Sequence, residues 1–138
     1  MRTRHLTAFF ILYAAGSLGC SGGNQPAFPE LHSVKGVVKK DGQPVSGGSV
    51  RFVPDPDKGE FLVNSEVGPD GTFSLSTVRT TDRSGERRSG APAGKYKVTY
   101  TPPLGDQSAG PQANPIDLPN PITVSAGDND IPIDLPKK

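Results

Sequence analysis

The chain has 138 residues, 33% of them hydrophobic, and carries a formal net charge of +1. This length accommodates one domain with one modest hydrophobic core, so a two-domain protein is not expected. Two of the 15 basic residues, Arg2 and Arg4, lie in the first 19 residues, and the remaining 13 nearly balance the 14 acidic residues. Because this balance leaves no broad basic surface, we expect no nucleic-acid partner.

The first 19 residues have the features of a cleaved signal peptide. Basic residues are followed by an apolar run over residues 6–15 and then by small residues up to Cys20. The apolar run is about half as long as a helix that crosses a bilayer, so a permanent transmembrane helix is the weaker interpretation. Export is the stronger one, and the single cysteine excludes an intramolecular disulfide.

The segment Ser17-Leu18-Gly19-Cys20 resembles the lipobox of bacterial lipoproteins. The resemblance implies that the Cys20 thiol carries a diacylglyceryl group and that the chain is cut directly before it. Buried acyl chains contribute about 0.8 kcal/mol per CH₂, which would anchor the protein on a membrane of the cell envelope, at the outer membrane or on the periplasmic or cell-surface face. The alternative is an ordinary signal peptide cut near Ala14 or Ala15, which leaves a free thiol.

A tether and a domain are predicted after the cysteine. Residues 20–31 are dominated by Gly, Asn, Gln and Pro without periodicity, as in a flexible tether. Residues 32–138 contain short runs of β-branched and aromatic residues separated by Gly and Pro. This pattern is typical of an ordered all-β domain with many turns.

Four strands are predicted in the first half of this domain. Val34 and Val38 share one face of the first strand, and Asp41-Gly42 supplies the turn after it. Val50 and Phe52 point inward on the second strand. The third and fourth strands cover residues 61–67 and 72–76, and the sequence Gly68-Pro69-Asp70-Gly71 between them predicts the clearest hairpin of the chain.

Three further strands are predicted in the second half. After a polar stretch over residues 80–93, Tyr96, Val98 and Tyr100 alternate with polar residues. The segment Gly94-Lys-Tyr-Lys-Val98 resembles the tyrosine corner of immunoglobulin-like sandwiches, in which a Tyr hydroxyl bonds to upstream backbone.

The last two strands are expected to form a closing hairpin over residues 122–135, with its turn at Ala126-Gly127-Asp128-Asn129. Pro132 and Pro136 cannot donate hydrogen bonds to a neighbouring strand, so the final strand is predicted at a sheet edge. The Pro-rich segment from Pro102 to Pro121 is predicted to be a mobile or functional loop, because structureless segments of this length are uncommon in compact domains.

The fold class predicted from these segments is an all-β, antiparallel sandwich of about seven strands. Five sequence segments, each a strand or a turn, follow one another in this order: Val34-Lys-Gly-Val-Val-Lys-Lys-Asp-Gly-Gln-Pro-Val45, Gly48-Ser-Val-Arg-Phe-Val-Pro54, Pro69-Asp-Gly-Thr-Phe-Ser-Leu75, Ala93-Gly-Lys-Tyr-Lys-Val98 and Gly127-Asp-Asn129. Together they resemble the carboxypeptidase regulatory-like domains of short bacterial lipoproteins. The resemblance implies a transthyretin-like (prealbumin-like) or immunoglobulin-like sandwich and an envelope location, but no particular activity.

Catalytic chemistry finds little support in the sequence. After the leader there is one histidine, His32, and no nucleophile elbow, zinc-ligand cluster or phosphate-binding glycine loop occurs. We therefore predict a protein that is not an enzyme and needs no cofactor or metal. Four carboxylates suit Ca²⁺ if the fold gathers them, although solvated turn residues are the ordinary interpretation. They are Asp55, Asp57, Glu60 and Asp70.

The candidate interaction loop contains Arg79, Arg83, Arg87 and Arg88. Guanidinium groups bind anionic glycans and lipid headgroups through paired hydrogen bonds. A solvated loop in which Glu86 offsets the arginines is the open alternative. The first function hypothesis is a noncatalytic, lipid-anchored module that binds a protein or polymer of the cell envelope. The second is a structural spacer lipoprotein, and the third is a hydrolase that uses His32.

Overall fold

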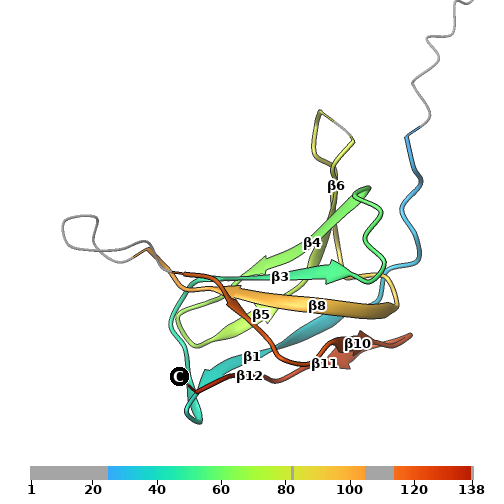
Figure 1. The fold of residues 1–138 in the computed structure, drawn as a ribbon. Helices are drawn as coiled ribbons and strands as arrows, with labels where there is room; N and C mark the ends of the chain where they lie inside the picture. Colours follow the sequence, from blue (N-terminus) through green and yellow to red (C-terminus); the bar gives the residue numbers. More distant parts are fainter. Residues whose placement is uncertain (1–24, 82, 105–113, 138) are drawn as a thin grey trace, which may run out of the picture.

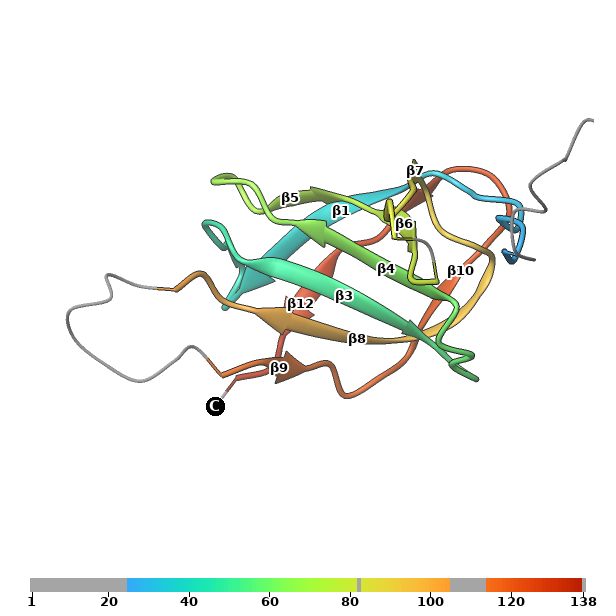
Figure 2. The same cartoon turned by 90° about the horizontal axis from the view of Figure 1, so that it is seen from above.

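The computed structural model describes residues 25–81, 83–104 and 114–137, and all regular structure in these ranges is β (Figure 1). Two sheets enclose one core, as the two perpendicular views show (Figures 1 and 2). The predicted all-β sandwich is therefore confirmed. No helix in the described ranges is long and apolar enough to cross a membrane. The predicted signal peptide and Cys20 lie outside the described residues.

The smaller sheet has five strands with β1 at its centre. They are β1 (Val34–Lys40), β2 (Gln43–Pro44), β5 (Thr72–Ser74), β11 (Asn129–Asp130) and β12 (Ile133–Leu135). β2 and β5 pair antiparallel with β1, whereas β11 and β12 run parallel to it. The first strand of the domain thus holds the last strands of the chain in place.

The larger sheet has seven strands in the order β10-β8-β3-β4-β6-β7, with β9 beside β8. They are β3 (Ser49–Pro54), β4 (Phe61–Glu66), β6 (Ser76–Arg79), β7 (Arg87–Ser89), β8 (Gly94–Thr101), β9 (Ile116–Asp117) and β10 (Ile122–Val124). Every pairing in this sheet is antiparallel.

The core forms because alternate residues of the long strands point between the two sheets. The inward alternation predicted for β1, β3 and β8 is confirmed, since these residues are almost fully buried: Val34, Val38, Val50, Phe52, Tyr96, Val98 and Tyr100. Phe52 joins the layers. Its ring centroid lies 6.2 Å from that of Phe73 in the smaller sheet and 5.8 Å from that of Tyr96 in the larger sheet.

The first predicted turn joins β1 to β2. Asp41 and Gly42 both have positive φ, 52° and 81°, as two-residue hairpin turns require. Lys40 pairs with Gln43 across this turn.

The predicted hairpin over residues 61–76 forms at its turn but opens in its middle. Val67 bridges Phe73 beside the turn, and β4 pairs with β6 in the same register farther on. Between these points β5 leaves β4 and pairs with β1, while the Ser74 amide donates to Ser65 Oγ at 3.1 Å. The chain therefore passes from one sheet to the other at buried Leu75, although its alternation continues unbroken.

The hairpin predicted around Gly127 is wrong. β10 pairs with β8 in the larger sheet, whereas β11 and β12 pair with β1 in the smaller one. Asn129 closes the turn with its side chain, whose Nδ2 donates to the carbonyls of Ser125 (2.8 Å) and Ser33 (3.3 Å). This redirects the chain to the other sheet. The predicted edge position of the last strand is confirmed, because β12 pairs with β1 alone and Pro132 is exposed.

Tyr96 makes the hydrogen bond expected of a tyrosine corner. Its hydroxyl donates to the carbonyl of Pro92 at 2.6 Å. Burial of the ring raises the pKa of Tyr96 to about 12. Tyr100 follows the same pattern, because its hydroxyl donates to the Gly47 carbonyl at 2.8 Å and burial raises its pKa.

The prediction of about seven strands is too low, because the described residues contain twelve strand segments. The predicted polar stretch contains β7, and the Pro-rich segment contains β9, which pairs Ile116 with Tyr100. β7 is exposed at all three positions, so its sequence carries no apolar alternation. Backbone pairing with β6 alone defines it.

Candidate functional site

The four candidate arginines do not share one loop. Arg79 ends β6, Arg87 and Arg88 lie in β7, and Arg83 lies in the exposed turn between these strands. In the register of the larger sheet, Arg88 is opposite buried Thr77, so Arg79 and Arg88 share the inner face of the sheet. Arg87 points to the outer face, where it donates to Asn64 Oδ1 at 3.4 Å. The candidate loop thus contributes to two opposite faces.

The segment before β1 covers the inner face at this end of the sheet. Residues 25–33, which we call the strap, run beside β4 and β6 where these strands extend past the smaller sheet (Figure 1). Phe28 of the strap lies against Phe61 of β4, with ring centroids 5.3 Å apart. The guanidinium carbons of Arg79 and Arg88 lie over the Phe28 ring, 4.6 Å and 4.4 Å from its centroid. A segment predicted as a tether therefore contacts the sandwich.

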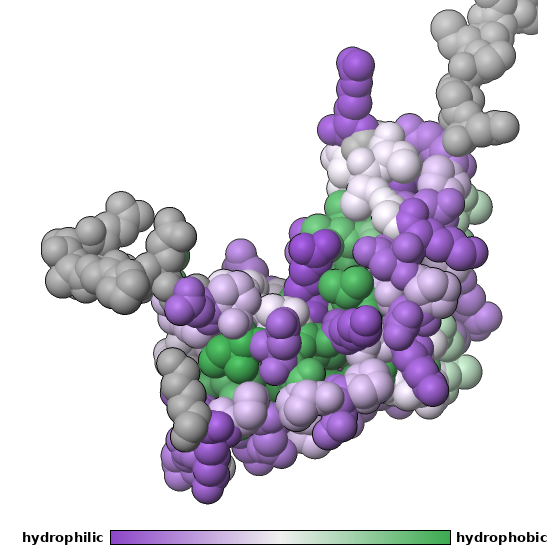
Figure 3. Space-filling view, viewed as in Figure 1, coloured by the Kyte–Doolittle hydropathy of each residue, from purple (hydrophilic) through white to green (hydrophobic). Residues whose placement is uncertain are grey.

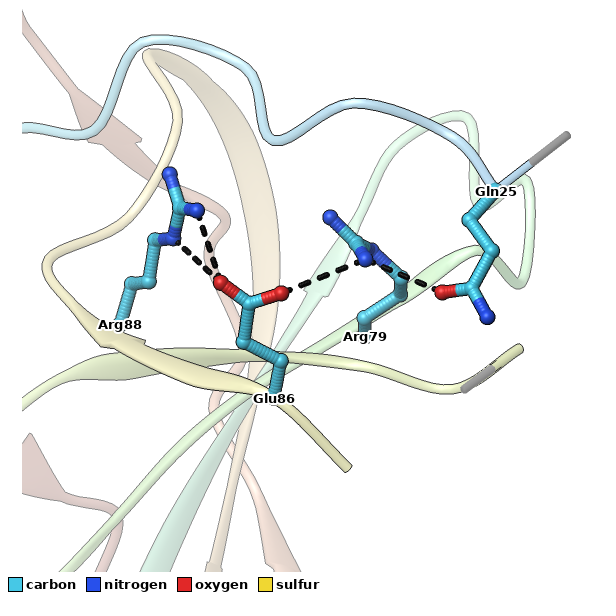
Figure 4. A network of polar contacts seen from close by, with 4 residues as sticks. All are labelled: Gln25, Arg79, Glu86 and Arg88. Atoms are coloured by element: carbon cyan, nitrogen blue, oxygen red, sulfur yellow. Dashed lines mark hydrogen bonds and ion pairs between the residues drawn. The ribbon is translucent and has the colours of Figure 1, made fainter. Parts of the chain in front are cut away.

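Polar contacts link the two arginines to each other and to the strap (Figure 4). Glu86 lies between the two arginines: Oε1 accepts from Arg88 Nη2 at 2.7 Å, and Oε2 lies 3.3 Å from Arg79 Nη1. On the other side, Arg79 Nη1 donates to Gln25 Oε1 of the strap at 3.0 Å. We call Phe28, Arg79, Glu86 and Arg88 the clasp. It joins the strap to β6 and to the strand β7 that sequence alone does not reveal.

Burial differs between the two cations of the clasp. The Arg79 side chain is 12% exposed and that of Arg88 55%. Arg79 Nε is buried without a hydrogen-bond partner among the described residues, and the Phe28 ring is the group beside its guanidinium. Cation–π contacts contribute about 0.5–1 kcal/mol when exposed and about 2 kcal/mol when desolvated. Exposed ion pairs contribute at most about 1 kcal/mol. The Arg79 contact is thus the stronger half of the clasp.

His32 fastens the other end of the strap. Its backbone pairs with that of Ala91 through two hydrogen bonds of 2.9 Å. Its Nδ1 accepts a hydrogen bond from the Gly127 amide at 3.2 Å. Through these contacts, His32 has a structural role where the strap, the segment before β8 and the turn before β11 meet.

The candidate calcium carboxylates are not brought together. Asp55, Asp57 and Glu60 lie in the loop between β3 and β4, whereas Asp70 lies in the turn at the opposite end of β4. Asp70 Oδ1 accepts from the Thr72 hydroxyl at 2.7 Å and from the Thr72 amide, and these bonds lower the pKa of its carboxyl. In the described part of the chain, no three His, Cys, Asp or Glu residues are placed to hold a metal ion.

The strap also forms a wall of a cleft of about 510 Å³. Ala27 and Pro29 line one side, the β3–β4 loop over residues 54–61 lines another, and Pro92–Tyr96 at the start of β8 complete it. A second cleft, of about 560 Å³, opens where β4 and β5 diverge and is lined by Lys35, Glu66 and Asp130 among others. The Ser65 hydroxyl in the second cleft is engaged with backbone: its Oγ donates to the Glu66 carbonyl at 2.7 Å and accepts from the Ser74 amide.

Apolar side chains remain partly visible between the two sheets on the face of Figure 3. The partly buried residues that pack against the core include Val45, Ile116, Leu118, Ile122 and Ile131. Leu104, at the described end of the segment after β8, is 71% exposed. The predicted Pro102–Pro121 loop is described only in part.

No protein-family model, curated protein or solved structure matches this chain. Sequence analysis found the arginines but missed Phe28, whose only signal is an aromatic residue between prolines in an otherwise polar segment.

Proposed function

We propose that the chain is a noncatalytic, lipid-anchored β-sandwich protein of the bacterial cell envelope that binds an envelope protein or polymer. The observation that carries the anchor is the sequence Ser17-Leu18-Gly19-Cys20 directly after an apolar run of signal-peptide length. Acyl chains on Cys20 would hold the folded domain on the membrane surface. The two-sheet domain after the strap would then be the part that a partner meets.

The engagement of His32 supports a noncatalytic role. It is the one histidine after the leader, and its Nδ1 accepts a backbone hydrogen bond from Gly127. A general base needs a free nitrogen directed at a substrate or nucleophile. Neither cleft is lined by His32.

The proposed partner surface is narrower than the loop suggested by sequence. Arg79 and Arg88 are occupied by Glu86 and Phe28, whereas Arg83 lies in an exposed turn and exposed Arg87 donates a long hydrogen bond, 3.4 Å, to the neutral Asn64 side chain. A guanidinium that already has an acceptor and an aromatic neighbour has less capacity left for an anionic ligand. Arg83 and Arg87 are therefore the residues that we propose for contact with an acidic protein or polymer.

Mass spectrometry of the mature protein from bacterial membranes tests the anchor. We expect an amino terminus at Cys20 with acyl chains attached. An unmodified thiol, or cleavage near Ala14 or Ala15, would exclude the anchor. Cys20→Ser should move the protein from the membrane fraction to the soluble fraction.

Crosslinking in intact cells tests the partner. We expect a reproducible neighbour whose yield falls at least several-fold in the double variant Arg83→Gln/Arg87→Gln. The matched control Lys39→Gln/Lys40→Gln removes two charges from the smaller sheet and should leave the yield unchanged. If the intact protein yields no neighbour, the spacer hypothesis replaces the binding hypothesis.

A further inference from the structure

We infer that the clasp orients the sandwich on its membrane, so that the strap end faces the lipid headgroups and the opposite end points away. Arg83, in the β6–β7 turn, belongs to the strap end, so the acidic partner proposed above would contact the domain beside the membrane. This inference rests on the proposed lipid anchor at Cys20 and adds which surface of the domain meets the bilayer. It follows from where the strap is fastened and from the short chain that precedes it.

Covalent geometry limits the distance between the anchor and the domain. Gln25, whose side chain accepts a hydrogen bond from Arg79, is five residues from Cys20. A fully extended chain spans at most about 3.6 Å per residue, so Gln25 lies within about 18 Å of the anchored residue. Without the contacts of Gln25 and Phe28, the first fixed residue would be His32. It is twelve residues from Cys20, which gives a reach of about 43 Å. The hydrogen bond of Gln25 thus removes more than half of this reach, and Phe28 of the clasp, eight residues from Cys20, limits it to about 29 Å.

The clasp lies at one end of the sandwich rather than at its middle. The strap, the β3–β4 loop and the β6–β7 turn lie together at this end, whereas the β1–β2 turn and the turn before β5 lie at the other (Figures 1 and 2). The cleft shared by Ala27, Pro29 and Lys58 confirms that the strap and the β3–β4 loop are neighbours. β8 has eight residues and rises about 3.3 Å per residue, so the two ends are roughly 25 Å apart.

Charge does not supply this orientation. The exposed residues of the strap end carry both signs: Asp55, Asp57 and Glu60 are acidic, and Lys58, Arg83 and Lys95 are basic. A polybasic surface is attracted to anionic lipid headgroups, but a surface with charges of both signs has no such preference. The short covalent connection therefore sets the orientation, and lipid composition should not change it.

Energy transfer from the protein to the bilayer tests the inference. The acylated full-length chain is reconstituted into vesicles that contain rhodamine-labelled headgroups, and a donor dye is placed at Lys58→Cys (strap end) or Gln43→Cys (opposite end). Because the lipid occupies Cys20, each variant has one free thiol. We expect clearly higher transfer from position 58 than from position 43, equally on phosphatidylcholine vesicles and on vesicles with one third phosphatidylglycerol.

Clasp variants then show whether the strap causes the difference. Phe28→Ala, which removes the ring that both arginines contact, should bring the two transfer values together. Arg88→Ala leaves Arg79 over the ring and should reduce the difference by less, whereas Arg87→Ala should preserve it. Each variant is checked for an unchanged β-type far-ultraviolet spectrum. Arg87 and Arg88 are adjacent, but only Arg88 lies over Phe28.

The two proposals fail in different ways. Cys20 without acyl chains, seen by mass spectrometry of the same sample, overturns the anchor and the orientation together. Acylated Cys20 with equal transfer from both positions, or with a difference that needs anionic lipid or survives Phe28→Ala, overturns the orientation alone.

Discussion

Two regions of this molecule bury aromatic rings by different means. Between the sheets, Phe52 is 1% exposed and its neighbours are apolar or aromatic. In the clasp, Phe28 is only partly buried and its neighbours are Phe61 and two arginines. The core depends on the removal of apolar area from water, whereas the clasp depends on weaker, partly screened electrostatic contacts. We therefore expect the core to set the stability of the fold and the clasp to set the position of its amino-terminal segment.

The largest expected effect is on the core. Phe52→Ala removes a buried ring that contacts both sheets and leaves a cavity, so we expect a loss of about 3–5 kcal/mol in the free energy of unfolding. Urea unfolding followed by circular dichroism measures it. A loss below about 1 kcal/mol would mean that the sheets do not pack through this ring.

Gly36→Ala should cost about 3 kcal/mol by a different route. A Cβ at position 36 would lie 1.9 Å from the carbonyl oxygen of Ile131, which is backbone and cannot turn aside. The pairing of β1 with β11 and β12 would have to shift. The neighbouring exposed Lys35→Ala is the control, and equal unfolding midpoints for the two variants would contradict the close approach.

High pH should weaken the core through Tyr96. Its pKa is 10.0 without burial and about 12 in the folded protein, so folding favours the neutral phenol. The stabilisation is complete below pH 10 and is lost as the pH rises from 10 to 12, by at most about 3 kcal/mol. Unfolding measured at pH 8 and pH 11.5 should show a smaller pH dependence in Tyr96→Phe. An identical dependence in both proteins would exclude Tyr96 as its source.

The clasp should give the smallest effect on stability. Phe28→Ala is expected to lower the free energy of unfolding by about 1–2 kcal/mol, since it removes two cation–π contacts and the contact with Phe61. Phe28→Leu keeps an apolar side chain and should recover part of the loss. Arg87→Ala should stay within about 0.5 kcal/mol of the parent. Limited proteolysis of the strap should accelerate in Phe28→Ala, and an unchanged cleavage rate would argue against the clasp.

Sequence alone was sufficient for the parts in which local pattern and final environment agree. The alternation of Val34 with Val38, of Val50 with Phe52 and through Tyr96 to Tyr100 predicted the inward faces correctly, because a strand has only two faces. It also predicted the Tyr96 hydroxyl bond and the Asp41-Gly42 turn, which depend on residues close together in the chain.

Which strands and side chains contact one another was decided by tertiary structure alone. Alternation states which face of a strand is buried, but not which strand lies beside it, so the hairpin predicted at Gly127 became two strands in different sheets. Phe28 meets Arg79 and Arg88 from more than fifty residues away in the chain, and no local signal encodes such a contact. Sequence thus determined the all-β class and the core residues through short-range sterics and hydrophobicity. Only the assembled sheets decided where the strap lies, because that contact exists once β4, β6 and β7 stand side by side.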